Sequence, residues 1–355
     1  MNRREFLKSA AALAAFSLSE VPRAQQIVPI ADMHSHYGLI QRKSSESGLA
    51  DEMRSQRVAL VAWKHVADGP WLRTTKTGIE QAREPLPGQL LAHFNRSLER
   101  MKSYLGSHQL RLVLTQADVD ASVAGDAGIV LASEGADFLE GDIGNLNGAY
   151  EKGLRHLQLV HYSHTPVGDF QTIAPTYNGL SSMGKQLVEV CNAKGILVDL
   201  AHSTEASVEQ ALDISKAPLV WSHSWVDNVG GNWQDQFGYQ RRRLSLALAK
   251  KIAERGGVIG IWGLGMSRPA RDWPLGAGDT RGYAYQIAAL VDKIGADHVA
   301  FGTDMEGVGN YPAINSYAQL RMVVEHLQDM KLNASVIESV AYRNYARVLK
   351  SVLTA

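Results

Sequence analysis

Two histidines separated by one residue lie early in the chain, in the stretch ADMHSHYG at residues 31–38. His34 and His36 follow the apolar run IVPI, which is typical of a buried strand. Side chains two residues apart on a strand point to the same side. The pair is therefore a candidate for binding one metal ion, because neutral imidazole is a common metal ligand.

Further side chains that could bind metal stand at the ends of other short apolar runs. They are Glu134, His161, His202, His223 and Asp304. One histidine after a strand is more often a hydrogen-bonded structural residue than a ligand, but six strand ends of this kind are hard to ascribe to chance. Imidazole and carboxylate together suit zinc and other borderline divalent ions. The pattern therefore predicts a metal centre.

The number of these ligands is enough for two ions. Two ions about 3.5–4 Å apart can share a carboxylate and a hydroxide, and the pKa of the bound water falls towards about 7. A neighbouring carboxylate can then move a proton to the leaving group. No cysteine belongs to the set, which excludes a closed thiolate site. The single cysteine, Cys191, falls in a predicted helix, where we expect it to be buried.

The elements that must position these residues are short apolar strands separated by helical patterns. The strands lack strict alternation, as expected when both faces are buried. The candidate strands are Ile27–His34, Val58–Trp63, Gly128–Glu134, Leu154–His161, Gly195–His202, Pro218–His223, Gly257–Gly263 and Val299–Asp304. Helices are predicted over Ser181–Lys194, Thr204–Ile214, Ser245–Arg255, Arg281–Ile294, Ser316–Met330 and Ala334–Leu353.

Eight strands alternating with helices predict an α/β fold, a (β/α)8 TIM barrel of the metal-dependent hydrolase type. In such a barrel the carboxyl ends of the strands converge on one mouth, where active sites are built. The stretch Trp63–Asp126 is less regular and should contain a long loop with one or more helices. The alternative is a doubly wound open sheet, but no glycine-rich phosphate turn follows an early strand to favour it.

Length and composition suit a soluble globular enzyme. The 355 residues could form one large barrel or two ordinary domains. No linker or low-complexity tract follows residue 26, so we predict a single catalytic barrel over residues 27–355. The 36 basic and 36 acidic residues cancel, which argues against a nucleic-acid partner.

The first 26 residues resemble a twin-arginine export signal. Arg3 and Arg4 precede the residues FLK, and the short apolar run AAALAAFSL follows. That run is too short to span a bilayer, which takes about 20 apolar residues. A basic start with a short apolar middle is typical of a signal peptide. We therefore expect a periplasmic or secreted protein with no membrane span; the alternative is an amphipathic helix of the mature protein.

After residue 27 the chain resembles the membrane dipeptidase, or renal dipeptidase, family of dinuclear zinc peptidases. The resemblance rests on the long stretches GLRHLQLVHYSHTPVGD, GLSSMGKQLVEVCNAKGILVDLAHSTEAS and SKAPLVWSHS, with a further match at FGTDMEG. It implies a barrel related to the amidohydrolases, two Zn²⁺ ions per chain and hydrolysis of dipeptides. Dimerisation is common in that family, so a homodimer is an expectation that the sequence itself does not indicate.

The resemblance also implies a role for each candidate. His34 matches the histidine of the first-strand motif His-x-Asp, and Glu134 matches the glutamate that bridges the two ions. His202 and His223 match the two histidines of the second ion. Asp304 matches the last-strand aspartate, a ligand of the first ion that also carries a proton to the leaving amine.

Two further matches concern the substrate, and one position departs from the family. His161 matches a histidine that polarises the scissile carbonyl without binding metal. Arg242, in YQRRRLS, best matches the arginine that holds the substrate carboxylate, and Arg241 and Arg243 flank it. His36 stands where the family has aspartate, although His-x-His is usual in the wider superfamily. A neutral ligand there makes the metal pair one unit more positive, which should lower the pKa of bound water and weaken the hold on the first ion.

The leading hypothesis is therefore a metal-dependent dipeptidase that uses a metal-bridging hydroxide, with Glu134, His161 and Asp304 as catalytic residues and Arg242 as the carboxylate anchor. Its small-molecule substrate would be a dipeptide or a related amide.

Two other functions stay open. Because of His36, the substrate could be another amide or a lactone, such as an N-acyl amino acid or a β-lactam. Tryptophans expected near the mouth also motivate this reading, unless they simply pack long loops: Trp221, Trp225, Trp233, Trp262 and Trp273. The third alternative is a binding protein with a decayed site.

Overall fold

The computed structural model describes residues 27–40, 48–76, 78–227, 229, 239–265, 277–309 and 311–355. The predicted export signal, Trp233 and Trp273 lie outside the described residues. Among the described residues, no helix is both long enough and apolar enough to cross a bilayer.

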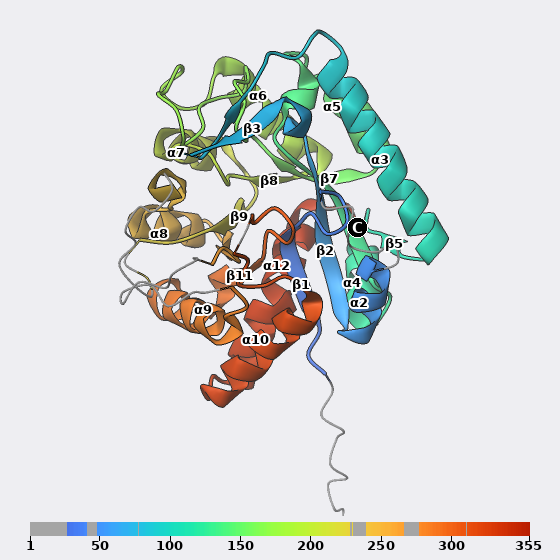
Figure 1. Ribbon diagram of the computed structural model, residues 1–355, viewed down its shortest axis with the longest axis vertical. Helices are drawn as coiled ribbons and strands as arrows, with labels where there is room; N and C mark the ends of the chain where they lie inside the picture. The colour runs from blue at the N-terminus through green and yellow to red at the C-terminus, as the bar shows by residue number, and fades with distance from the viewer. Residues whose placement is uncertain are drawn as a thin grey trace, which may run out of the picture.

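Eight parallel strands form a closed barrel, visible in the centre of Figure 1. They are β1 (Ile30–Ser35), β2 (Val58–Val66), β6 (Gly128–Glu134), β7 (Leu154–Gln158), β8 (Leu197–Asp199), β9 (Val220–Ser224), β10 (Val258–Trp262) and β11 (Val299–Gly302). Each strand pairs with its neighbour in the chain, β11 pairs with β1, and the pairing of β2 with β6 closes the ring. The (β/α)8 prediction is confirmed, and the open doubly wound alternative is wrong because a sheet of that kind has free edges.

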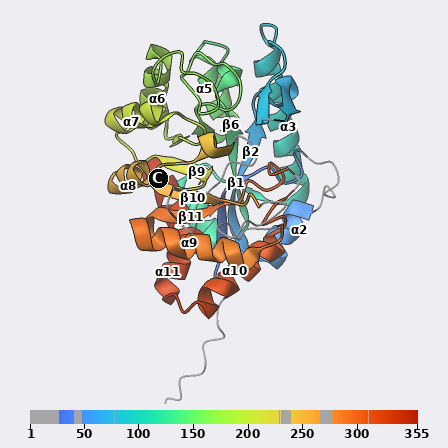
Figure 2. The ribbon, with the colours of Figure 1, turned by 60° about the vertical axis from the view of Figure 1, so that its left-hand side comes forward.

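Helices surround the barrel, as the two views in Figures 1 and 2 show. They include α6 (Ser182–Lys194), α7 (Glu205–Ile214), α8 (Leu246–Glu254), α9 (Thr280–Ile294) and α10 (Tyr317–Asp329). Ser181, Thr204, Ser245 and Ser316 each accept a backbone N–H of the helix that follows. These caps satisfy backbone N–H donors that have no partner inside the helix. The same Ser and Thr residues begin the predicted helices, so the predicted starts agree with the structure. Cys191 in α6 is fully buried, as predicted.

The irregular stretch after β2 contains several elements before the barrel continues at β6. They are the short helix η1 (Gly69–Trp71), the hairpin of β3 (Leu72–Thr75) and β4 (Gly78–Gln81), α3 (Gln89–His108), β5 (Arg111–Leu112) and α4 (Gln116–Ala124). In Figure 1, α3 is the long helix along the right-hand side of the barrel. The remaining helix near the start of the chain is α2 (Gly48–Ser55), and α5 (Asn145–Glu151) precedes β7.

Several predicted boundaries differ from the structure, by up to three residues for the strands. β7 and β8 end three residues earlier than predicted, so that His161 and His202 stand on the loops beyond them. β2 runs three residues further, to Val66. The predicted final helix is divided into α11 (Ala334–Glu338), a π-helical turn over Ser339–Arg343 and α12 (Asn344–Val352). Asn344, directly after that turn, donates to the carbonyl oxygens of Ala296 and Val299, so tertiary contacts accompany the irregularity.

The interior of the barrel changes from apolar to polar along each strand. On β6, Val130 and Ala132 belong to an apolar cluster that also includes Tyr345 and Val348 of α12. The next residue on the same face is Glu134, because side chains repeat every two residues on a strand. Burial of this cluster anchors one end of the barrel and leaves the other end for polar groups.

A buried ion pair occupies the layer between the apolar cluster and the mouth. The Lys64 ammonium pairs with the Asp199 carboxylate, and both side chains are fully buried. Lys64 also donates to Gln158 Oε1 at 3.2 Å and to Ser222 Oγ at 3.3 Å. Burial alone would raise the pKa of Asp199, but the charge of Lys64 holds it well below its usual range. Each of the two buried charges is therefore stabilised by the other.

Replacing one member of this pair should destabilise the fold. In Lys64→Met the Asp199 carboxylate stays buried without its cation, and we expect the free energy of unfolding in urea to fall by about 3–5 kcal/mol. The control is Lys251→Met, which removes a surface lysine paired with Glu209 and should leave stability almost unchanged. A K64M protein as stable as the wild type would show that the pair is not needed to hold Asp199.

Candidate metal centre

Glu134 is the residue around which the predicted ligands gather. It is the last residue of β6 and only 3% exposed. Its Oε1 lies 3.4 Å from His34 Nε2, 3.2 Å from His202 Nε2 and 3.7 Å from His223 Nε2. Its Oε2 lies 3.1 Å from His36 Nε2. A buried carboxylate with four imidazole nitrogens facing it is a site suited to cations.

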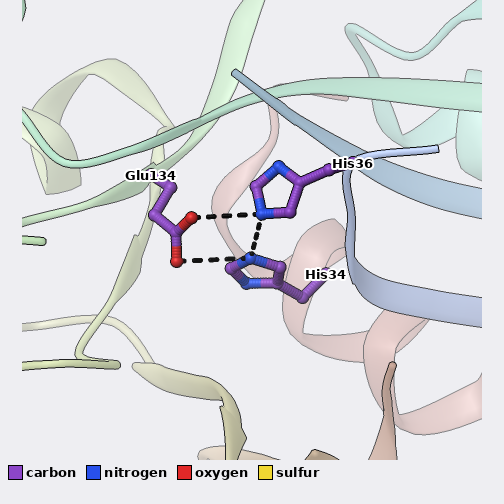
Figure 3. A group of neighbouring side chains, drawn as sticks. All are labelled: His34, His36 and Glu134. Carbon is purple, nitrogen blue, oxygen red and sulfur yellow. Dashed lines mark hydrogen bonds and ion pairs between the residues drawn. The ribbon is translucent and has the colours of Figure 1, made fainter. Parts of the chain in front are cut away.

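The residues fall into two groups that could each hold a metal ion, and both groups contain Glu134. In the first, shown in Figure 3, His34 and His36 point from the end of β1 toward the Glu134 carboxylate. Their Nε2 atoms are 3.0 Å apart. Asp304, from the loop after β11, adds an oxygen 3.2 Å from His36 Nε2. Trp262 Nε1 donates to the other Asp304 oxygen at 2.8 Å and so fixes the direction of this carboxylate.

His36 is oriented as a ligand would be. Its Nδ1 donates to the carbonyl oxygen of Lys64 at 2.8 Å, which leaves Nε2 facing Glu134 and Asp304. A hydrogen bond from the remote ring nitrogen to a carbonyl is the usual support of a metal-binding histidine. The histidine at this position therefore offers a donor atom to the centre.

The second group is Glu134, His202 and His223. The two Nε2 atoms are 3.2 Å apart. Ser222 Oγ lies 3.2 Å from His223 Nδ1 and 2.9 Å from His34 Nδ1, so one hydroxyl contacts a histidine of each group. Through Ser222 these two rings are connected to Lys64 and the ion pair beneath the mouth.

The electrostatics of the centre favour an ionised Glu134 with neutral His34, His202 and His223. Burial holds the pKa of His34, His202 and His223 well below its usual range. Burial would raise the pKa of Glu134, but the charge of His161 and contacts with His34 and His202 bring it well below its usual range. Burial would also lower the pKa of His36, but the carboxylates of Asp304 and Glu134 raise it to about 10. The same two carboxylates would attract a metal cation to this position.

Two of the candidate ligands have an unusual backbone conformation. His202 and Asp304 have φ values of 70° and 54°, in the left-handed region that disfavours side chains with a Cβ. Such strain persists only where the surrounding structure enforces it, and it gathers at functional sites. Gly307 permits the close loop over this centre, because a Cβ there would lie 2.0 Å from Asp304 Oδ1.

His161 lies beside the centre, in neither of the two groups. Its Nε2 is 3.4 Å from Glu134 Oε2, and its Nδ1 is 2.6 Å from Asp68 Oδ1. Asp68 is fully buried and also accepts the backbone N–H of Tyr162 at 3.1 Å. Burial would lower the pKa of His161, but the charges of Asp68 and Glu134 raise it. Asp68 thus orients the His161 ring toward the centre and favours its protonated form.

Sequence reasoning missed Asp68, although a signal for it existed. The predicted second strand ended at Trp63 and had no polar residue at its end. The observed β2 ends at Val66, two residues before Asp68, so that the same rule would have found it.

The structure places Arg242 beside the second group, next to His223. Arg242, in the short helix η3 (Tyr239–Arg242), is 1% exposed and stacks over Trp262 at 4.9 Å. It donates to Tyr162 Oη at 2.8 Å and lies 3.0 Å from His223 Nε2. The flanking arginines are directed elsewhere, since Arg241 donates to the Thr172 carbonyl oxygen and Arg243 pairs with Asp227.

A cavity of about 470 Å³ joins these residues. Its wall includes Glu134, His161, Arg242, Trp262 and Asp304. The size is within the range of sites for small molecules. Trp262 is the only one of the three described candidate tryptophans that lines it, while Trp221 and Trp225 are buried in the core.

Comparison with known proteins finds similarity to dipeptidases. The family model described as membrane dipeptidase, peptidase family M19, matches residues 53–355. Dipeptidase 3 of Mus musculus is 24% identical over 63% of this chain and 44% of its own length. Dipeptidase verJ of Clonostachys rogersoniana is 25% identical over 69% of this chain and 61% of its own length. The chain thus spans about half the length of these relatives.

Solved structures share the fold at low sequence identity. A metallo peptidase from Rhodobacter sphaeroides, solved with a phosphinate mimic of the dipeptide L-Ala-D-Ala, superposes with a TM-score of 0.75. The match has 20% identity and covers 92% of this chain and 99% of that chain.

The shared carboxylate predicts how metal binding responds to mutation. A divalent ion added to metal-depleted wild-type protein should raise the free energy of unfolding, by about 2.7 kcal/mol at 100 times its Kd. Glu134→Gln should abolish this gain, because Glu134 belongs to both groups. Thermal unfolding with and without Zn²⁺ measures the effect. His164→Ala, an exposed histidine outside both groups, should respond like the wild type; an E134Q protein that Zn²⁺ stabilises fully would contradict the assignment.

Proposed function

The chain belongs to the membrane dipeptidase family, peptidase family M19, and on that premise we propose that it is a metal-dependent dipeptidase. The observation that carries the proposal is that Glu134 is common to two groups of metal-competent side chains in one cavity with Arg242. A hydrolytic centre and a cation for the carboxylate of a small substrate are thus present together. The activity, the zinc ions and the substrate belong to the proposal.

The donor set fits two Zn²⁺ ions, since it contains imidazole and carboxylate groups and no thiolate. The first ion would be held by His34, His36, Glu134 and Asp304, and the second by Glu134, His202 and His223. When bound, such a pair supplies a Lewis acid and a hydroxide nucleophile at neutral pH. The side chains of the protein must do the rest: bind the substrate, orient its carbonyl and move a proton.

His161 and Asp304 are the groups placed to act on the peptide bond. His161 presents Nε2–H toward the centre, where it can donate to the scissile carbonyl oxygen and stabilise the negative charge that develops there. Asp304 is held by Trp262 with one oxygen facing the centre, so it can accept a proton and pass it to the leaving amine.

Arg242 can anchor the carboxylate at the carboxyl end of the dipeptide. Its guanidinium is buried beside Tyr162 and Trp262 and has no carboxylate partner among the described residues. A planar guanidinium binds carboxylate through two parallel hydrogen bonds, which fixes both position and orientation. The scissile carbonyl of a bound dipeptide then lies between Arg242 and Glu134.

We further propose that the protein acts in the periplasm or outside the cell after twin-arginine export, since residues 1–26 resemble such a signal. Peptides released from the cell wall are plausible substrates there. A homodimer is proposed only because dimerisation is common in the family.

A second candidate function follows from His36. A metal-bound His36 is a neutral imidazole where the resemblance implies an anion, so the centre would offer less attraction for the ammonium group of a free dipeptide. Hydrolysis of an N-acyl amino acid, a β-lactam or another amide or lactone would suit that change. A strong preference for dipeptides with a free amino group over their N-acetyl forms would count against this alternative.

The proposal predicts hydrolysis of simple dipeptides by zinc-loaded protein. A panel of L-X-L-X and L-X-D-X peptides should include L-Ala-D-Ala, because the related Rhodobacter sphaeroides structure holds a mimic of that dipeptide. Release of free amino acids, followed by ninhydrin or mass spectrometry, measures activity. A chelator should abolish it and added Zn²⁺ should restore it. Cleavage that survives both a chelator and Glu134→Ala would contradict the mechanism.

The contact between Asp68 and His161 predicts a kinetic effect. In Asp68→Asn, the backbone N–H of Tyr162 requires the amide oxygen, so the amide NH₂ faces His161 Nδ1 and favours a neutral ring. A neutral Nε2–H is a weaker donor than a cationic one, so kcat should fall about tenfold with little change in KM. The matched control is the surface substitution Asp292→Asn, which should leave both constants unchanged. A D68N enzyme with wild-type kcat would show that Asp68 does not act through His161.

A further inference from the structure

The cavity continues past the candidate ligands to a wall that the proposed reaction does not use. This wall, here called the β2–α3 wall, consists of His65 on β2 and His93, Ser97 and Arg100 on α3. It lies on the same cavity as Glu134 and His161. Its side chains carry hydrogen-bond donors and positive charge, and it contains no carboxylate.

His65 is a buried polar group without a partner. It is 3% exposed, and its Nε2 has no hydrogen-bond partner among the described residues. Its ring packs against that of His93 at 4.6 Å between centroids. Buried polar atoms in native proteins are usually satisfied, so one that lines a cavity indicates a missing ligand or water.

Arg100 provides the charge of this wall. Its guanidinium donates to Ser97 Oγ at 3.2 Å, and no described carboxylate lies within ion-pair distance of it. The other arginine at the outer part of the cavity differs, because Arg73 pairs with Glu80 at 2.7 Å. The three carboxylates of the cavity belong to other elements, β6 and the loop after β11: Glu134, Asp304 and Glu306. Arg100 is exposed and has no carboxylate partner among the described residues, so its guanidinium is free to bind an anion at this wall.

The position of the wall relative to Arg242 indicates which part of a substrate reaches it. Arg242 contacts His223 on β9 and Trp262 on β10. In the ring order β2-β1-β11-β10-β9, strand β9 is four steps from β2, which is the opposite side of an eight-stranded barrel. A dipeptide anchored at Arg242, with its scissile carbonyl near Glu134, therefore extends its amino-terminal residue toward the β2–α3 wall.

We propose that the β2–α3 wall is a subsite for a carboxylate on the amino-terminal residue of the substrate, so that the enzyme prefers dipeptides beginning with glutamate or aspartate. The inference rests on the proposed function and deepens it. A carboxylate at this wall receives charge-assisted hydrogen bonds from Arg100 and a donor from the otherwise unpartnered His65. The anion is on the side chain of the amino-terminal residue, so the substrate keeps the free amino group of an ordinary dipeptide.

The test compares two peptides of equal size that differ in charge, L-Glu-L-Ala and L-Gln-L-Ala. We expect kcat/KM for the glutamate peptide to exceed that for the glutamine peptide by about tenfold, the effect of one charge-assisted contact. In Arg100→Gln this ratio should fall toward one. Arg96→Gln is the matched control, because Arg96 is an exposed arginine one turn earlier on α3 that does not line the cavity. It should keep the wild-type ratio.

The outcomes separate this inference from the proposed function. Hydrolysis of both peptides at equal kcat/KM, or a ratio that R100Q leaves unchanged, overturns the subsite but not the dipeptidase. If neither peptide is cleaved, activity on the wider dipeptide panel decides the dipeptidase proposal, and calorimetric binding of both peptides to Glu134→Gln decides the subsite without turnover. Tighter binding of the glutamate peptide, lost in the double variant with R100Q, supports it; equal affinities overturn it.

Discussion

A carboxylate buried among imidazoles is the constraint on which the rest of this structure depends. An ionised Glu134 at 3% exposure would be costly without compensating positive charge or hydrogen bonds. Five histidines, from β1, the loops after β7 and β8, and β9, lie within 3.7 Å of its oxygens. No short segment of chain could bring these groups together. The closed barrel does so because its parallel strands all deliver their carboxyl ends to one mouth.

The layer beneath the mouth connects the stability of the barrel to the geometry of the centre. Lys64 and Asp199 neutralise each other inside the barrel, and Lys64 also reaches the Ser222 hydroxyl. Ser222 in turn contacts the remote nitrogens of His34 and His223. The rings that face Glu134 are thus held from behind by a polar network, which is the arrangement that orients ligands in metal sites. The same network would resist rearrangement when the protein is free of metal.

The charged groups of the cavity are arranged across the mouth of the barrel rather than along the barrel axis. Arg242 lies on the β9–β10 side, the carboxylates lie at the centre and on the β11 loop, and Arg100 lies on the β2–α3 side. A barrel core determines the position of the centre, whereas the elements outside it determine what surrounds the centre. The insertion between β2 and β6 contributes the hairpin and α3 that form the outer wall. Differences in substrate within one family are expected to arise from such insertions.

Local patterns in the sequence determined the eight strands, most helix starts and the residues at the strand ends, because these depend on hydrophobic period and capping within a few positions. Together with the barrel rule they were enough to predict that His34, His36, Glu134, His202, His223 and Asp304 would meet. The family resemblance, and no local pattern, implied that Glu134 serves two groups and that Arg242 rather than its neighbours enters the cavity, and the tertiary structure has both arrangements. The support of His161 by Asp68 appears only in the tertiary structure. These features depend on the direction of long side chains and on contacts between loops distant in the chain, which no local pattern encodes.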